Sequence, residues 1–586
     1  MGKRTYLIGN FCIIACLILL LKGRAMFPPY LITALFALYT AAKNRSFEPG
    51  TDKKRSYCQI VISFVAAVFI TLANYGIWLH PQMPEVRSSL FVRIVKLALI
   101  LIIMSGTYFS AYNILLFVFT KTGELTFIPP SEDKRKKALF FFIPFASISL
   151  IYLIIYACCY YPGLLSLDSI DQVGQVMSGQ YSNHQPFYHT LILGVFLRIG
   201  TALFGSINAA VATYVVFQII FMAFTFAFVI YNMAVLKLPT WACAVTAVWY
   251  AVMPFHIMYS FTVWKDVYFG AFVTLMIIFF IRLMKGIGSS IASYVGFTLC
   301  SLVMCLIRSN GLFAYVFVLL SVVLLARKQK KLILIMIATV VAAFVLKHSV
   351  LSLLGVTPPD TVESLSIPLQ QIARTIADDG YIDPEDAGFL SQIADITAIA
   401  DTYDPNISDP VKNMIRDFGN EDHLKENMGA FAKLYVRTFI HNPMSYVTAW
   451  VDSTCGYWNS GYDYWIWYWD IEDNPYGITK TVVSDNVHRF MDEYLWLYYN
   501  NDLLLLFTAT GFFFWIVLFL TAICAAAKNR TGIIASVPIL AIVLSLLVST
   551  PVFAEFRYVY AMFCALPILI AVTTVADDTD CKGGLT

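Results

Sequence analysis

Two aspartates and several amides interrupt an otherwise apolar chain between residues 160 and 190. The segment SLDSIDQVGQVM places Asp168 and Asp171 three residues apart, and Gln172 and Gln175 continue the helical spacing. This spacing predicts a short helix with acidic and amide groups on one face. A carboxylate there could act as a general base that takes a proton from a hydroxyl. The alternative is that Asp168 only caps the helix.

His184 follows in the segment SNHQPF, shortly before Pro186 fixes the backbone ahead of the next apolar run. Its imidazole could bind a substrate or a metal ion, and the alternative is a structural histidine with satisfied hydrogen bonds. Three more polar pairs stand at the ends of apolar runs. They are Lys265 and Asp266 in TVWKDVYF, Arg308 and Asn310 in LIRSNGLF, and Glu555 and Arg557 in AEFRYVY. Arginine forks onto phosphate, so such cations could bind an anion; alternatively they are snorkelling anchors.

The elements that must position these residues are membrane helices. Hydrophobic residues make up 59% of the 586 residues and charged residues 13%, with a mean hydropathy of +0.71. Apolar runs of about 17 to 25 residues can each cross a bilayer as a helix. The sequence therefore predicts an all-α polytopic membrane protein with about 14 transmembrane helices. They are expected at roughly 6–21, 26–42, 58–80, 95–119, 139–160, 208–233, 240–259, 265–284, 288–307, 311–327, 331–350, 502–526, 532–550 and 556–577.

A further apolar stretch, residues 189–205, decides the orientation of everything after it. If it does not cross, basic clusters such as 134–137 and 327–331 lie on the same side as the N-terminus. The positive-inside rule then places both termini in the cytoplasm. We therefore expect 189–205 to lie in the outer leaflet as a juxtamembrane helix, with a crossing helix as the alternative. The polar segment 161–207 is then an extracytoplasmic loop.

The longest loop agrees with this orientation. Between residues 357 and 500 the sequence has 23 Asp and Glu but only 8 Lys and Arg. Helix-like stretches such as VESLSIPLQQIARTIADD and MGAFAKLYVRTFIH predict a mainly helical extracytoplasmic subdomain. The expected organisation is N-terminal helices at 1–138, a transmembrane core at 139–350, the acidic subdomain at 351–501, and C-terminal helices with a short cytoplasmic tail at 502–586.

Several classes of function lack a signature. The predicted cytoplasmic loops are too short for a nucleotide-binding domain, and the sequence has no dinucleotide fingerprint, P-loop or HExxH motif. Its 12 cysteines show no CxxC spacing. The basic clusters lack the aromatic interleaving of nucleic-acid-binding surfaces. We therefore expect extracytoplasmic chemistry without nucleic acid and with no cofactor or metal site demanded by the sequence, although a divalent cation would be compatible with it.

The order of the polar motifs resembles one family. The motifs are Pro162, Gly163, Asp168, Ser169 and Gln172 in a PG-x(4)-DS-x-x-Q element, then Asn183, His184 and Pro186, WKD at 264–266, RSNG at 308–311, SIPLQQ at 366–371 and EFRY at 555–558. From about residue 140 to 577 this series resembles the GT-C superfamily of integral-membrane glycosyltransferases, in particular a poorly characterised bacterial branch. Many relatives have His-Pro where this chain has His184-Gln185-Pro186. The first four predicted spans look like an addition to the GT-C-like core.

The resemblance implies a GT-C-like fold whose extracytoplasmic loop carries a catalytic carboxylate, here Asp168, with Asp171 as a second candidate. The donor would be a polyprenyl-phosphate sugar and the acceptor an extracytoplasmic glycan, lipid or protein, at the plasma membrane of a bacterium. In a single inverting displacement, Asp168 would accept the hydroxyl proton while Arg308, with Lys265 or Arg557, stabilises the lipid phosphate. The remaining expected substrate-binding residues are His184, Asp266, Asn310 and Glu555.

Two other readings stay open. Fourteen spans would also suit a flippase for lipid-linked oligosaccharides, although few charged residues lie inside the predicted spans. A polysaccharide polymerase or O-antigen-ligase-like enzyme would also have a large late extracytoplasmic loop, where Arg437 and His441 are available.

Overall fold

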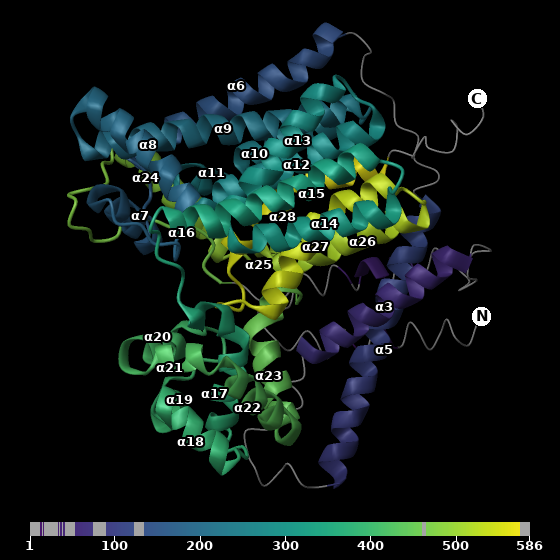
Figure 1. Ribbon diagram of the computed structural model, residues 1–586. Coiled ribbons are helices and arrows are strands. Elements are labelled where there is room, and N and C mark those ends of the chain that lie inside the picture. Colours follow the sequence, from purple (N-terminus) through teal and green to yellow (C-terminus); the bar gives the residue numbers. More distant parts are fainter. Residues whose placement is uncertain are drawn as a thin grey trace.

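The computed structural model describes residues 53–73, 90–121, 134–459 and 464–574, together with single positions between 12 and 40 (Figure 1). The described residues form helices and isolated bridges but no strand. The predicted spans 6–21 and 26–42 lie largely outside the described residues, as does the predicted cytoplasmic tail.

Within these ranges, nine helices are long and apolar enough to cross a membrane. They are α5 (Leu90–Lys121), α6 (Lys134–Cys159), α8 (Phe187–Phe204), α9 (Ile207–Val235), α12 (Lys265–Lys285), α13 (Ser290–Ile307), α15 (Lys330–Val345) with its continuation to Leu353, α27 (Arg530–Val548), and η7 (Phe556–Val559) with α28 (Tyr560–Thr573). The helices α10 (Thr240–Val252) and α11 (Pro254–Phe261) form one more candidate, bent by 54°. The predicted all-α polytopic membrane protein is confirmed, whereas the number fourteen stays a prediction.

Other predicted spans have shorter or interrupted helices. Three are apolar helices below the usual spanning length: α3 (Lys53–Ala73) in its apolar part, α14 (Ser309–Leu325) and α26 (Thr510–Ala526). The predicted span 502–526 begins with the short turns α25 (Asp502–Leu505) and η6 (Leu506–Thr508) before the backbone leaves the helix at Ala509. The predicted span 331–350 ends in a π-helical turn, η3 (Leu346–Val350), and α16 (Leu351–Leu353).

The helix α8 has the length of a span, but the elements before and after it contact the same loop. Before α8, Gly174 of α7 (Leu167–Ser178) packs against the Tyr476 hydroxyl. After α8, the Asn208 side chain donates a hydrogen bond to the Thr479 carbonyl at 3.2 Å. Tyr476 and Thr479 belong to the same loop. Because α7 before α8 and Asn208 after it contact the same loop, these contacts support the predicted juxtamembrane helix over the crossing alternative.

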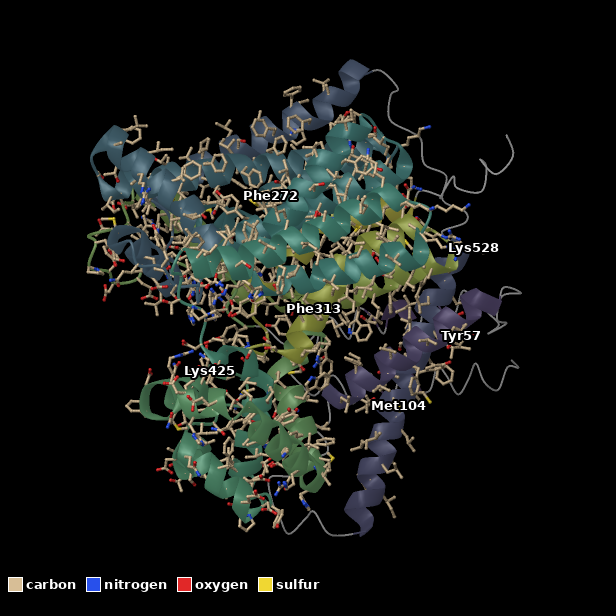
Figure 2. All side chains as sticks on the ribbon, viewed as in Figure 1. Tyr57, Met104, Phe272, Phe313, Lys425 and Lys528 are labelled. Carbon is tan, nitrogen blue, oxygen red and sulfur yellow. The ribbon has the colours of Figure 1, made fainter. Side chains whose placement is uncertain are left out.

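From α9 onward the chain runs back and forth between the α7 end of the bundle and the opposite end. The turns at the opposite end are basic: Lys237 follows α9, Arg282 and Lys285 end α12, and residues 327–331 join α14 to α15. Figure 2 shows Lys528 at this opposite end, between α26 and α27. The basic clusters of this part of the bundle therefore lie on one face, as the sequence predicts.

Between α16 and Tyr446 the chain forms a helical subdomain with its own hydrophobic core, running from Val362 to Tyr446. Its helices are η4 (Thr361–Leu365), α17 (Ser366–Ala377), α18 (Pro384–Ile393), α19 (Ile396–Thr402), α20 (Asp409–Phe418), α21 (Glu421–Glu426), α22 (Met428–His441) and α23 (Pro443–Thr454). The two helix-like stretches noted in the sequence coincide with η4 and α17 and with α22. From Val451 onward, through η5 (Cys455–Tyr457) and α24 (Asp485–Tyr499), side chains join the core of the bundle. The subdomain is therefore shorter than the predicted 351–501.

Two short backbone pairings join the subdomain to the bundle. Ser182 pairs with Thr357 ahead of η4. On the other side, Ile407 pairs with Val552, in a segment that continues directly to Glu555. The subdomain therefore contacts the segment that leads to His184 and the segment that leads to Glu555.

Candidate active site

A glycine and a short backbone pairing position the start of α7. Gly163 has a φ of 139°, and a Cβ there would come within 2.6 Å of the Val215 side chain, so only glycine fits. The Leu164 N–H donates to the Phe261 carbonyl, and the Val263 N–H donates to the Leu164 carbonyl, both at 2.9 Å. This pairing holds the start of α7 beside the start of α12, so tertiary contact brings the PG element next to the WKD motif.

The carboxylate of Asp168 faces an arginine from the far end of the sequence. Ser166 is the N-cap of α7 and Ser169 Oγ accepts a hydrogen bond from its N–H at 3.3 Å, so the alternative that Asp168 is the cap is wrong. Asp168 Oδ2 instead accepts a hydrogen bond from Arg557 Nη1 at 2.8 Å. Arg557 Nε lies 3.1 Å from Glu555 Oε1. Arg557 thus bridges two carboxylates, one 35% exposed at Asp168 and one 3% exposed at Glu555.

A second ion pair lies deeper in the bundle. Arg308 Nη1 pairs with Asp266 Oδ1, and the two side chains are 10% and 1% exposed. Arg308 is extended between α13 and α14, with φ −132° and ψ 149°. A Cβ at Gly311 would collide with the Met304 carbonyl oxygen, so the glycine of the RSNG motif allows the tight turn that presents Arg308.

Two residues of this region were not singled out in the sequence. Gln185 Oε1 accepts a hydrogen bond from Lys265 Nζ. Lys347, in the π-helical turn η3, donates from Nζ to the Arg308 carbonyl at 2.9 Å. The available signal for Lys347 was its position as a charged residue within a predicted span, which by default marks a functional site. For Gln185, the departure from a His-Pro pair was the signal.

Aromatic rings surround the two arginines. The Arg557 guanidinium lies 5.4 Å from the Trp264 ring centre, 6.0 Å from Trp465 and 5.4 Å from Tyr558. The Arg308 guanidinium lies 4.7 Å from the centre of the same Tyr558 ring. Cation–π contacts of this kind hold guanidinium groups without neutralising them. The rings therefore orient the two arginines, while their charges are balanced in part by the carboxylates described above.

The cluster has more cations than carboxylates. The cations are Lys265, Arg308, Lys347 and Arg557, and the carboxylates are Asp168, Asp266 and Glu555. Burial by itself raises the pKa of Asp168, but attraction to Lys265 and Arg557 outweighs it and leaves that pKa below its usual value. Burial raises the pKa of Glu555 to about 7, against the attraction of Arg557. Near neutral pH the cluster is therefore net positive and suited to an anion.

Beneath α7, a buried hydrogen-bonded network holds the helix in place. Gln172 Oε1 lies 2.9 Å from His189 Nδ1, and Gln172 Nε2 donates to Thr190 Oγ1 at 2.9 Å. His189 Nε2 lies 2.8 Å from the Tyr214 hydroxyl. Because both ring nitrogens have partners, His189 is a structural histidine, and Gln172 of the PG-x(4)-DS-x-x-Q element is a positioning residue.

Three predicted site residues lie outside the cluster. Asp171 is exposed and accepts a hydrogen bond from Gln175 on the same helix at 2.9 Å. Asn310 donates to Ser545 at 3.1 Å and so ties α14 to α27. His184 is exposed, although a charge on it would act on Asp168. Helical spacing predicted Asp168 and Asp171 on one face of the helix. In the structure, however, Asp171 does not share the surroundings of Asp168.

The two residues available for a polymerase or ligase reading are also elsewhere. Arg437 of α22 lies within 3.5 Å of three carboxylates of the subdomain, those of Asp383, Glu385 and Asp386. His441 packs its ring against Tyr381, with 4.9 Å between the ring centres. Arg437 is thus already surrounded by acidic groups.

Within the described ranges, no group of three or more His, Cys, Asp or Glu side chains is placed to hold a metal ion. Neither a curated protein nor a solved structure gives a significant match to the sequence. One family model matches residues 177–582, which contain Lys265, Arg308 and Arg557 but not Asp168. On the strength of this match, which covers well over half of the sequence, the chain belongs to the Family of unknown function (DUF6020).

Proposed function

We propose that this protein is a membrane glycosyltransferase that transfers a sugar from a polyprenyl-phosphate donor to an extracytoplasmic glycan, lipid or protein. The observation that carries the proposal is the contact between Asp168 and Arg557, which sets a partly exposed, ionised carboxylate beside a cation-rich cluster. A carboxylate that can accept a proton and cations that can hold a phosphate are the two parts that this transfer needs.

The position of the cluster supports a lipid-linked donor. It lies at the ends of α12, α13 and α28, so the head group of an amphipathic donor would reach it while the polyprenyl chain stays in the bilayer. The basic turns lie at the opposite end of the bundle, and the positive-inside rule assigns that end to the cytoplasm. In this proposal the protein is a GT-C-like enzyme of a bacterial plasma membrane, with both termini in the cytoplasm and its active site outside.

The proposed reaction is a single displacement at the anomeric carbon. An acceptor hydroxyl oxygen forms a bond to that carbon while its proton passes to Asp168. The bond between the anomeric carbon and the phosphate oxygen breaks, and its electron pair leaves with the lipid phosphate. Arg308 and Arg557 then stabilise the added negative charge. Lys265 and Lys347 add positive charge around the same position.

The salt bridge gives the proposed base a way to respond to the donor. Attraction to Lys265 and Arg557 lowers the pKa of Asp168 in the free protein, which keeps it ionised but makes it a weak base. A lipid phosphate that binds Arg557 competes with Asp168 for the same guanidinium. Loss of that partner raises the pKa of Asp168 towards the range in which a general base is effective. Donor binding would in this way prepare the base.

The test is sugar transfer by purified protein in nanodiscs, with a panel of radiolabelled polyprenyl-phosphate monosaccharides and cell-envelope extract as acceptor. Asp168→Asn should lower transfer by about 100-fold or more, the usual contribution of a general base. Asp171→Asn is the matched variant, because Asp171 lies one turn along the same helix outside the cluster, and it should retain most of the activity. Full transfer by folded Asp168→Asn would exclude Asp168 as the base.

The same preparation separates the alternatives. Movement of lipid-linked glycan across vesicles without a new glycosidic bond would favour a flippase. Transfer of a whole glycan from a lipid pyrophosphate, in place of one sugar from a monophosphate, would favour a polymerase or ligase.

A further inference from the structure

The subdomain carries a stripe of exposed apolar side chains on α22 and α23. The stripe consists of Val436, Phe439, Ile440, Met444 and Val447, which are 37% to 67% exposed. From Thr361 to Thr454, where every residue is described, the only other exposed large hydrophobic side chains are Tyr381 and Phe418. Exposed apolar residues gathered on one face, as here, mark a surface that something else covers.

The stripe lies next to helices that cross the membrane. Trp450, at the other end of α23, donates from Nε1 to the Leu547 carbonyl of α27 at 2.8 Å. Its ring also packs against Phe69 of α3, with 6.3 Å between the ring centres. Val447 lies one turn before Trp450 and so shares that side of α23. The apolar surface of the membrane helices therefore continues onto the stripe.

The direction of α23 keeps the stripe near the membrane surface. In Figure 1, α23 leaves the bundle and runs across the direction of α14 and α15, with α22 beside it. Both helices lie on the side of the subdomain that faces α3 and α5, whereas α18 to α21 lie on the other side. A helix that runs across the spans at their ends lies along the plane of the membrane.

The charge of this segment also fits a membrane surface. Residues 428–451 contain no Asp or Glu of their own, although the loop 357–500 contains 23 of them. The three carboxylates from the start of α18 that reach α22 are paired with Arg437. The exposed Lys433 lies on the same side of α22 as Val436 and Ile440, at spacings of three and seven residues. A lysine at the edge of an apolar helix face can reach lipid phosphates, whereas carboxylates there would be repelled by them.

We propose that this stripe rests in the outer leaflet of the membrane that the spans cross, so that α22 and α23 anchor the subdomain on lipid. The subdomain is then held at the membrane by its covalent connections and by this surface contact. Ile407 of the subdomain pairs with Val552. The anchor would therefore also fix the depth, relative to the membrane surface, of the segment that leads to Glu555. This inference does not depend on the proposed glycosyl transfer.

The test places an environment-sensitive NBD label at Ile440→Cys, in full-length protein in nanodiscs. Phe418→Cys is the matched control because Phe418 is 88% exposed and ends α20, a helix on the other side of the subdomain from α22 and α23. Wild type labelled in the same way gives the background from the native cysteines. Lipids that carry a nitroxide near the head group serve as quenchers. Val436→Cys, at 54% exposure, provides a second position.

The label at 440 and at 436 should have blue-shifted emission and should be quenched by shallow nitroxide lipids, because interfacial helices sink only about 5–10 Å into the boundary region. The label at 418 should show neither effect. Emission at 440 and 436 that matches 418 would overturn the proposal, since the stripe would then face water. A blue shift without quenching by lipid would overturn it as well, because a protein surface would then cover the stripe.

Discussion

The buried carboxylate of Glu555 should give this protein a pH-dependent stability that one substitution removes. The side chain is 3% exposed, and burial raises its pKa from the usual 4.5 to about 7. Between these two pH values the folded protein holds a proton that the unfolded chain has released, so stability falls as the pH rises. One pKa unit corresponds to about 1.4 kcal/mol, so a difference of about 2.5 amounts to roughly 3 kcal/mol lost by about pH 7.

The assay compares wild type with Glu555→Gln by unfolding of protein in nanodiscs between about pH 4.5 and pH 8. The free energy of unfolding of the variant should rise relative to wild type across this range, by up to roughly 3 kcal/mol. Asp452 also has a pKa raised by burial, to about 6, but it contributes equally to both proteins and cancels in the difference. Glu385→Gln, at a side chain 82% exposed, is the control and should follow wild type.

Parallel curves for wild type and Glu555→Gln over the whole range would refute the reasoning. They would mean that Glu555 ionises at the same pH in the folded and unfolded chain. The carboxylate would then be solvated or fully paired, and the net positive charge assigned to the cluster near neutral pH would be smaller.

Four further substitutions test the cluster. Asp266→Asn or Arg308→Met alone should lower the free energy of unfolding by about 3–5 kcal/mol, because a buried charge loses its partner. The double variant should recover much of this loss. Simply additive losses in an unfolding assay would contradict a buried pair. Arg557→Lys keeps the charge but cannot bridge two carboxylates with one planar fork, so transfer should fall at least about tenfold, and undiminished transfer would exclude a role for the fork. Lys347→Met should raise the KM for the lipid donor by about tenfold or more, with little change in kcat, because one charged contact to the phosphate is lost. A loss confined to kcat would show that Lys347 does not bind the donor in its ground state.

Much of the helical framework could be predicted from the sequence. Within a membrane every backbone group must be bonded inside its own helix, so an apolar run of sufficient length suffices to predict one. The helices α7 and α22 were also recognisable, because helical spacing and turn residues are local signals. The bend at Pro254 is a local proline effect as well, yet it lay inside a run read as one straight span.

Which polar groups meet was decided only by the tertiary structure. Asp168 and Arg557 are 389 residues apart, and helical spacing alone does not distinguish Asp168 from Asp171, which lies one turn further along the same helix. The high pKa of Glu555 comes from burial by residues of distant segments. The course of α8 likewise depends on contacts that α7, before it, and Asn208, after it, make with one loop. The amino-acid sequence by itself therefore determined the helices and the kinds of charge at their ends, because these depend on neighbours along the chain. Only packing decided the pairing and burial of those charges, because electrostatic and hydrogen-bonding partners are chosen by distance in space.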